Sequence, residues 1–254
     1  MFAPLLYHPV FAPLAVAILG AIFGSFSAAL VARWPEDRSV LAGRSQCDSC
    51  GVTLKPRHLV PVLSFIMLRG KCAMCGKPIS RDTLWIELIA AAIGAMALAV
   101  HPGFSGLAIA IFGWLLLPLA WLDWRHFWLP HPLTAALATG ALVTAFAGLP
   151  PTPIDRAIGC VAGFAMLWLV AAAFKRLRGH DGLGGGDPLM FGAIGLWLGW
   201  QALPMVLLLA SGLGLLAALI MQARGRDISS ATRFPLGTLL AIAAWPVALL
   251  YPLA

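Results

Sequence analysis

Charged side chains are scarce in this sequence. They make up 11% of the 254 residues, whereas 61% are hydrophobic. An average soluble domain has about 25% charged residues, and a soluble globular enzyme is excluded because it could not bury this much apolar surface. Disordered chains are charged and poor in apolar residues, so disorder is excluded as well. Ten Trp and 13 Phe fit a polytopic membrane protein, in which aromatic rings gather at the membrane interfaces.

Basic residues are absent from the first ten positions. A cleavable signal peptide begins with a basic segment and has an apolar run of about 7–15 residues. The first apolar run here covers residues 11–32, so we expect it to be a retained membrane span. Five Cys without a signal pattern do not indicate a secreted disulfide scaffold, which would have an even number at framework spacings.

Long apolar runs dominate the rest of the chain. A helix needs about 20 predominantly apolar residues to cross the hydrocarbon core of a membrane. The sequence therefore predicts an all-α polytopic membrane protein with about eight transmembrane helices, at 11–32, 84–100, 105–122, 132–149, 157–174, 188–202, 203–223 and 236–252. The sixth run is short, and a half-span or a tilted helix is an alternative for it. Three parts are predicted: a first helix in 1–32, a small domain in 33–83 and a multi-helix membrane domain in 84–254.

The distribution of Lys and Arg predicts the orientation. Nine of the 17 basic residues lie between the first two predicted spans, and the positive-inside rule therefore places 33–83 in the cytoplasm and the N-terminus outside. With alternating spans, every basic residue except Arg156 then falls on the cytoplasmic side. The net charge of +7 is thus a topology signal. The expected partner is the lipid bilayer, and no nucleic acid is expected.

Four cysteines form a doubled motif in the segment 33–83. Cys47 and Cys50 make one Cys-x-x-Cys-Gly knuckle, and Cys72 and Cys75 make the second. A two-residue gap lets both thiolates reach one ion, and the following glycine permits the tight turn. The pattern predicts a structural Zn²⁺ site with four Cys ligands. Redox chemistry is the alternative, but it needs no matched pair of knuckles, and disulfides are disfavoured in the cytoplasm.

Two aspartates are predicted to lie at the cytoplasmic ends of helices. Asp123 ends the third predicted span, and Asp187 opens the sixth after the glycines Gly184, Gly185 and Gly186. Ionisable groups at such depth are candidates for function. Taken singly, Asp123 could pair with a neighbouring cation, and Asp187 could cap the helix that begins at Pro188.

Together the two carboxylates predict acid–base chemistry. Two carboxylates held close together cannot both ionise easily, so one keeps a proton while the other acts as a base. Such a pair can activate water against an amide and protonate the leaving nitrogen. The three glycines would let the backbone approach a bound extended peptide closely. A phosphate loop is a weaker alternative, because no Lys-Ser/Thr follows and the next residue is an acid.

The motifs resemble, in order, those of the prepilin leader peptidases, which are membrane aspartic proteases of the Gly-x-Gly-Asp type. The matching segments are Gly24–Phe26, Arg33–Pro35, Gly43–Ser45, the two cysteine knuckles, Leu59–Ser64, Arg69-Gly70, Pro78–Ser80, Glu87-Leu88, Leu122-Asp123 with Leu129-Pro130, Gly184–Asp187 and Phe234–Gly237. Two positions depart from the usual pattern. His131 stands where an acid often follows Leu-Pro, and Leu189 stands where a Lys is common.

The resemblance implies an activity, a location and a cofactor. Such enzymes cut the basic leader from type IV prepilins and type II secretion pseudopilins at the cytoplasmic face of the bacterial inner membrane. Many members with the cysteine domain also methylate the new N-terminus with S-adenosylmethionine. The residues themselves show no binding site for this methyl donor.

Two functions from other classes remain open at this stage. In an ion- or proton-coupled transporter the same two aspartates would bind a cation or relay protons, although a transporter site is expected near the membrane midplane. In a zinc-knuckle scaffold the cysteines would be essential and the aspartates would not.

Overall fold

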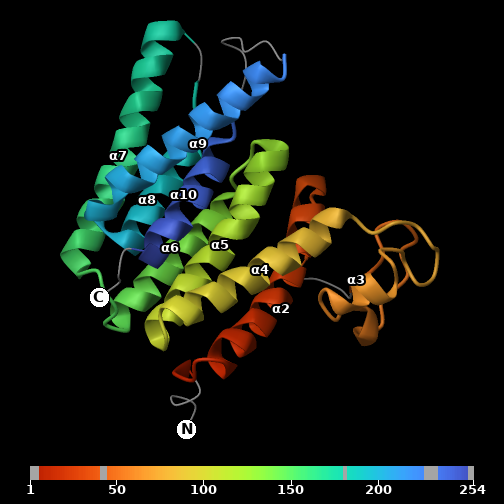
Figure 1. The fold of residues 1–254 in the computed structure, drawn as a ribbon. Coiled ribbons are helices and arrows are strands. Elements are labelled where there is room, and N and C mark those ends of the chain that lie inside the picture. The colour runs from red at the N-terminus through yellow and green to blue at the C-terminus, as the bar shows by residue number, and fades with distance from the viewer. Residues whose placement is uncertain (1–5, 41–44, 180–181, 226–233, 251–254) are drawn as a thin grey trace. The chain divides into compact units, whose positions relative to one another are not determined.

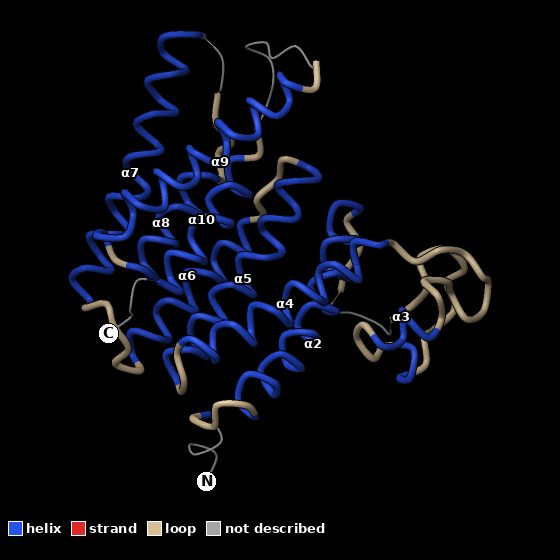
Figure 2. Tube along the Cα trace, in the orientation of Figure 1, coloured by secondary structure: helices blue, strands red, loops and turns tan. Residues whose placement is uncertain are grey.

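The computed structural model describes residues 6–40, 45–179, 182–225 and 234–250. In these ranges all named elements are helices, joined by loops that include two isolated β-bridges (Figures 1 and 2). The chain divides within a helix, at Pro118, into two compact units, residues 1–118 and 119–254.

The first unit is built on two long helices. These are α2 (Phe11–Arg33) and α4 (Arg81–Val100). Between them lie the 3₁₀ turns Trp34–Glu36 and Pro56–His58 and the short helix α3 (Leu63–Met67), and α5 (Phe104–His126) follows α4. The segment that carries the four cysteines is thus an insertion between α2 and α4.

Glycines bring α2 and α4 into close contact. A Cβ atom at Gly24 would lie 2.8 Å from Glu87 Cα, and one at Gly94 would lie 2.5 Å from the Val16 carbonyl oxygen. Small residues that allow such backbone approach are typical of helix pairs in membranes, where van der Waals packing replaces the hydrophobic effect. Trp114 of α5 completes this packing, because its indole N–H donates to the Ala90 carbonyl over 2.8 Å.

The second unit surrounds a short central helix. Its helices after α5 are α6 (His131–Phe146), α7 (Pro153–Arg178), α8 (Asp187–Leu198), α9 (Leu203–Ala223) and α10 (Leu236–Leu250). Ten of the 12 residues of α8 are buried. On α7, Gly159 and Gly163 face the backbone of α8 at Gly195 and Phe191. The helix that begins with Asp187 is therefore held in place by its neighbours.

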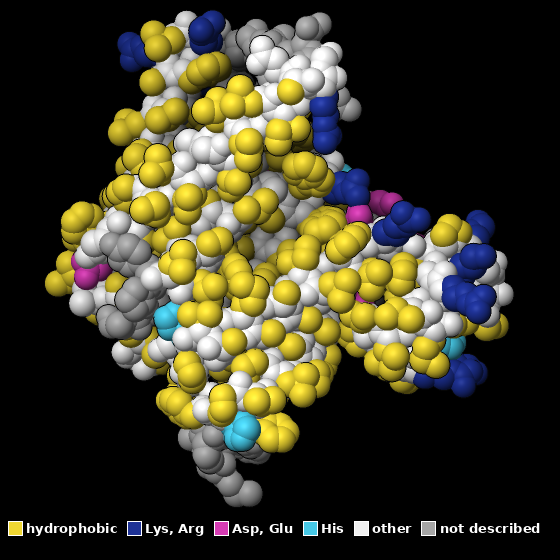
Figure 3. All heavy atoms as spheres, viewed as in Figure 1, with side chains coloured by type: hydrophobic (Ala, Val, Ile, Leu, Met, Phe, Trp, Pro, Cys, Tyr) yellow, Lys and Arg dark blue, Asp and Glu magenta, His cyan; other side chains and the backbone are white. Residues whose placement is uncertain are grey.

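The helix lengths bear on the number of spans. Five helices are long and apolar enough to cross a membrane, and apolar side chains are exposed over the helical surface (Figure 3). The runs predicted at 132–149, 188–202 and 236–252 form helices of 16, 12 and 15 residues. Each is shorter than the roughly 20 residues that a perpendicular crossing requires. A membrane protein with several spans is confirmed, whereas eight full spans are not established.

Arg156, the one basic residue predicted to lie on the outer side, is buried. It lies in the first turn of α7, and only 2% of its surface is exposed. The guanidinium donates to five backbone carbonyls, those of Ala141, Leu149, Pro150, Pro151 and Leu196, over 2.9–3.1 Å. Arg156 thereby joins the loop before α7 to the last turns of α6 and α8.

Replacing Arg156 with Met is expected to destabilise the second unit. The five carbonyls would lose a charged donor, and hydrogen bonds to charged groups contribute about 1.5–3 kcal/mol each. Because the losses are not additive, we expect the free energy of unfolding to fall by at least about 3 kcal/mol in total. Thermal unfolding in detergent measures this effect, and Arg156→Lys should lie between the wild type and Arg156→Met. An equal effect of Arg178→Met, at an exposed Arg, would contradict the prediction.

Candidate active site

The two predicted aspartates lie at helix ends in the same unit. Asp123 is in the last turn of α5, and Asp187 is the first residue of α8. Each is only 5% exposed. Since buried carboxylates must be hydrogen-bonded to be tolerated, their donors indicate how the site is built.

Asp123 is held by the first turn of α10. Its Oδ2 atom accepts the backbone N–H of Thr238 over 2.7 Å and lies 3.1 Å from the Thr238 hydroxyl. The same hydroxyl lies 2.9 Å from the Ala120 carbonyl oxygen. It has one proton, so it donates to one of these oxygens at a time. Thr238 thereby ties the end of α5 to the start of α10.

Asp187 is held by the glycine run that precedes it. Its Oδ2 atom accepts the backbone N–H of Gly184 over 3.0 Å, and its own N–H donates to the Gly184 carbonyl. The carboxylate thus faces back toward the glycines. The three glycines have different surroundings, because a Cβ at Gly186 would meet Leu129 at 2.7 Å, whereas Gly185 has open space around it.

One backbone N–H joins the two aspartates. The N–H of Gly237, which lies beside Thr238 in α10, acts electrostatically on both carboxylates, and the charge of Asp123 acts on Asp187. A Cβ at Gly237 would lie 3.1 Å from Asp123 Oδ2 and 2.9 Å from Leu129. A larger residue at this position would therefore require the Leu129 side chain or the Asp123 carboxylate to shift. Three separate parts of the chain, at residues 123, 187 and 237, meet at this point.

The roles of Gly237 and Thr238 in the site are not visible in the sequence. The segment Phe234–Gly237 stands out there only through its resemblance to a segment of the family. Their contribution is made largely by backbone N–H groups, which every residue except Pro carries. The only signal for them was a Gly at the start of an apolar run.

The four cysteines of the doubled motif come together in the first unit. The Sγ atoms of Cys47, Cys50, Cys72 and Cys75 all lie within 4.8 Å of one another, and those of Cys47 and Cys75 are 4.0 Å apart. Zn–S bonds of about 2.3 Å in a tetrahedron place sulfurs about 3.8 Å apart. The cluster fits a four-thiolate metal site.

The two knuckles have the same backbone geometry. Gly51 donates to the Cys47 carbonyl over 2.8 Å, and Gly76 donates to the Cys72 carbonyl over 3.0 Å. Both glycines have φ +69°, a left-handed conformation that favours Gly. The predicted tight turns are confirmed. Backbone N–H groups of Cys75 and Met74 lower the pKa of the Cys72 thiol to about 6, which favours the thiolate that a metal requires.

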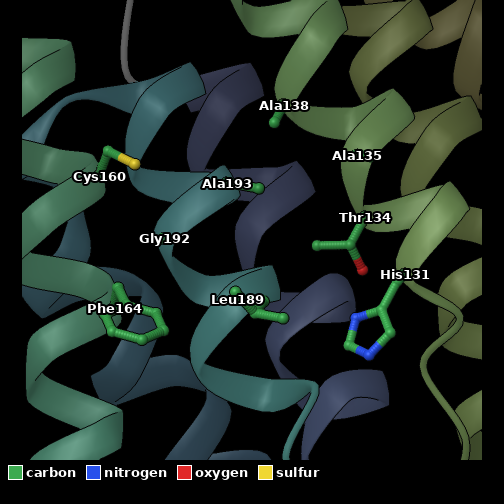
Figure 4. Close-up of a pocket in the computed structure, with 9 residues that line it drawn as sticks. All are labelled: His131, Thr134, Ala135, Ala138, Cys160, Phe164, Leu189, Gly192 and Ala193. Carbon is green, nitrogen blue, oxygen red and sulfur yellow. The ribbon is translucent and has the colours of Figure 1, made fainter.

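A separate pocket lies between α6, α7 and α8 (Figure 4). Its volume is about 360 Å³, and it is lined by His131, Thr134, Ala135, Ala138, Cys160, Phe164, Leu189, Gly192 and Ala193. The two positions at which the sequence departs from the resembled pattern, His131 and Leu189, both line this pocket. None of the lining residues is acidic.

Comparisons with known proteins agree with this geometry. Residues 18–101 match the model of the bacterial peptidase A24 N-terminal domain, and residues 110–219 match that of the type IV leader peptidase family. The cysteine cluster lies in the first match, and Asp123 and Asp187 lie in the second.

Curated relatives carry the name prepilin leader peptidase/N-methyltransferase. The protein of Aeromonas hydrophila is 37% identical over 84% of this chain and 73% of its own length. The protein of Burkholderia pseudomallei strain 1026b is 40% identical over 76% of this chain and 62% of its own length. The protein of Pseudomonas aeruginosa is 33% identical over 96% of this chain and 92% of its own length. No solved structure matches the chain.

Proposed function

Because this chain belongs to the type IV leader peptidase family, we propose that it cleaves the N-terminal leader from type IV prepilins and type II secretion pseudopilins. The observation that supports this most directly is the convergence of Asp123 and Asp187 on the N–H of Gly237. Two buried carboxylates so placed can share one proton. This is the arrangement that amide hydrolysis by an aspartyl dyad requires.

In the proposed mechanism the ionised aspartate removes a proton from a water molecule, and the water oxygen attacks the carbonyl carbon of the scissile amide. The protonated aspartate gives its proton to the leaving nitrogen as the C–N bond breaks. The backbone N–H groups of Thr238 and Gly184 hold the carboxylates in position. Gly184, Gly185 and Gly186 form the proposed substrate loop, and the space around Gly185 admits an extended backbone.

We place the site at the cytoplasmic face of the bacterial inner membrane, with eight spans and the N-terminus outside. The helix ends support this topology: basic residues close α2, open α4, and close α5 and α7. With alternating spans these ends all fall on one side, which the positive-inside rule makes cytoplasmic. Asp123 and Asp187 share that side, which disfavours a transporter with a site at the midplane.

We also propose that the cysteine cluster binds a structural Zn²⁺ ion through Cys47, Cys50, Cys72 and Cys75. The separation of the thiol sulfurs fits this ion. Four thiolates leave no open coordination position, so the ion would fold the segment 33–83 and take no part in hydrolysis. Among the described residues of this segment only Cys72 is buried, so the segment has no apolar core of its own and needs such a staple.

The names of the relatives support a second activity, N-methylation of the new N-terminus with S-adenosylmethionine as donor. The pocket between α6, α7 and α8 does not fit this donor. Ribose hydroxyls are commonly bound by a carboxylate, and the pocket has none. The methyl-transfer residues therefore stay unassigned.

Intact mass spectrometry tests the proposed function. A prepilin is incubated with the protein in detergent, with and without S-adenosylmethionine, beside a prepilin in which the residue before the cleavage point is changed. Loss of a leader-sized mass from the unaltered prepilin alone establishes the peptidase, and a donor-dependent gain of one methyl mass establishes the methyltransferase. Intact prepilins and pseudopilins under all conditions would overturn the peptidase proposal.

Replacing Thr238 with Val is expected to lower the cleavage rate about tenfold or more. The hydroxyl that contacts Asp123 is lost while the backbone N–H remains, and a hydrogen bond to a charged group contributes about 1.5–3 kcal/mol. Single-turnover cleavage measures the rate, and Thr238→Ser, which keeps the hydroxyl, is the matched control. Equal rates in Thr238→Val and the wild type would show that the hydroxyl has no part in positioning Asp123.

A further inference from the structure

The cysteine-containing segment exposes a group of large apolar side chains next to α3. They are Leu59, Val60, Leu63, Ile66 and Met67, with exposed fractions that rise from 38% at Leu59 to 74% at Met67. We call this group the apolar patch. A small extramembrane segment that exposes so many large apolar side chains together indicates an interaction surface.

A buried carboxylate fixes the apolar patch to the end of a membrane helix. The backbone N–H of Val62, in the middle of the patch, donates to Glu87 Oε2 over 2.6 Å. Val62 has φ +61°, which is an unfavourable backbone conformation for a β-branched residue. The hydrogen bond to Glu87 therefore offsets part of the conformational energy of this backbone. Glu87 is 4% exposed and also contacts the side chain of Ser25 in α2.

The position of Glu87 determines the depth of the patch. Glu87 follows Arg81, the first residue of α4, by six positions, which corresponds to about 9 Å along the helix axis. Since α4 is long and apolar enough to span a membrane, its first turns lie at the membrane interface. Figure 1 shows α3 near the end at which α4 begins. With α4 as a membrane span, the patch is held near the level of the headgroups.

Basic side chains flank the patch on both sides in the sequence. Lys55 and Arg57 precede it, Arg69 and Lys71 follow it, and all four are exposed. None of the four forms an ion pair with a residue that the structure describes. Figure 3 shows basic and apolar side chains side by side on this part of the molecule. Clusters of Lys and Arg beside a membrane helix attract anionic lipids.

We propose that the apolar patch inserts into the cytoplasmic leaflet, with Lys55, Arg57, Arg69 and Lys71 on anionic lipid headgroups. An apolar face bordered by cations is the pattern of elements that lie in the interface plane of a membrane. The same four cations repel a basic peptide, so the geometry favours lipid over such a partner. The cysteine-containing segment is then attached to the membrane in two ways: through the chain that joins it to α2 and α4, and through the apolar patch.

Photo-crosslinking in nanodiscs tests the proposal on the full chain. A benzophenone side chain is introduced in place of Met67 in one variant and of Met74 in another. Met74 is 66% exposed but lies in the second cysteine knuckle, outside the patch, and is the matched control. After illumination, intact mass spectrometry identifies the crosslinked molecule. We expect lipid adducts at position 67 at least about fivefold above those at position 74.

Charge reversal tests the lipid preference. In nanodiscs of mixed phosphatidylcholine and phosphatidylglycerol, adducts at position 67 should be enriched in phosphatidylglycerol. Arg57→Glu with Arg69→Glu should lower this enrichment at least about fivefold, whereas Lys77→Glu, outside the patch, should not. Lipid adducts should persist in phosphatidylcholine alone.

Three results would overturn the proposal: no lipid adduct at position 67, equal adducts at positions 67 and 74, or a crosslink to an added prepilin or to a second copy of the chain in place of lipid. The readout needs no catalysis, so it is independent of the proposed peptidase activity. Thermal unfolding measured in parallel shows that each variant is folded.

Discussion

Replacing Asp187 with Asn is expected to lower leader cleavage by at least about a thousandfold, within the range that loss of a general acid or base produces. Asn has nearly the same shape and still accepts the N–H of Gly184 through its oxygen, so the fold should be kept. It neither takes a proton from water nor gives one to the leaving nitrogen. Single-turnover cleavage followed by mass spectrometry gives the rate, and thermal unfolding confirms the fold.

Asp123→Asn should have an effect of the same size. Because the two carboxylates share one proton in the proposed mechanism, the double variant should be little slower than either single variant. Asp155→Asn is the matched control: Asp155 accepts side-chain donors of Trp200 and Gln201, far along the sequence from either aspartate of the dyad. Substantial cleavage by Asp187→Asn or Asp123→Asn, or losses that multiply in the double variant, would refute the dyad.

Replacing Cys47 and Cys75 together with Ser is expected to abolish metal binding and to unfold the cysteine segment. The two sulfurs lie 4.0 Å apart on different knuckles, so their loss removes half of the ligands and the link between the turns. Structural zinc contributes apparent binding free energies of about 10–16 kcal/mol in small metal-dependent domains. We expect amide exchange in residues 45–79 to rise to that of an unfolded chain, while α7 and α8 stay protected.

Elemental analysis measures the metal content, with about one Zn²⁺ per wild-type chain expected. Cys160→Ser is the matched control, because Cys160 lies in α7 outside the cluster. A wild-type protein that contains no metal and still protects residues 45–79 from exchange would refute the zinc proposal. Removing the metal with a chelator should raise amide exchange in residues 45–79 as the double substitution does. Low pH should favour metal loss because the thiolates take up protons.

Side-chain chemistry was largely predictable from the sequence, and backbone chemistry was not. The four cysteines of the doubled knuckle and the two aspartates are residue types that have few other uses at those positions. The structure brings the members of each set together. Their roles in metal binding and catalysis stay predictions. The N–H groups of Gly237 and Thr238 leave no trace in residue type. Their position depends on how α10 packs near α5 and α8, which periodicity does not specify.

Arg156 shows a different limit of sequence analysis. By the positive-inside rule it is the one exception among the basic residues, on the outer side, and its sequence position does not indicate that it is buried. The structure buries it among five carbonyls, which only the folded loop and two helix ends bring together. The number of spans stays a prediction for a related reason: apolar runs indicate where helices form, but the ends of helices depend on Pro, Gly and tertiary contacts.

The shortness of α8 has a consequence for where hydrolysis takes place. Its 12 residues rise about 18 Å, whereas the hydrocarbon layer is about 30 Å thick. In an eight-span arrangement the loops at one or both of its ends must bridge the difference, and where the loop before α8 does so, Gly184–Gly186 and Asp187 lie below the surface of the bilayer. Irregular backbone at such depth is tolerated only where protein or a water-filled recess covers it. In that proposed arrangement, water must reach a peptide bond that lies below the bilayer surface, and a substrate would not have to leave the membrane to be cut.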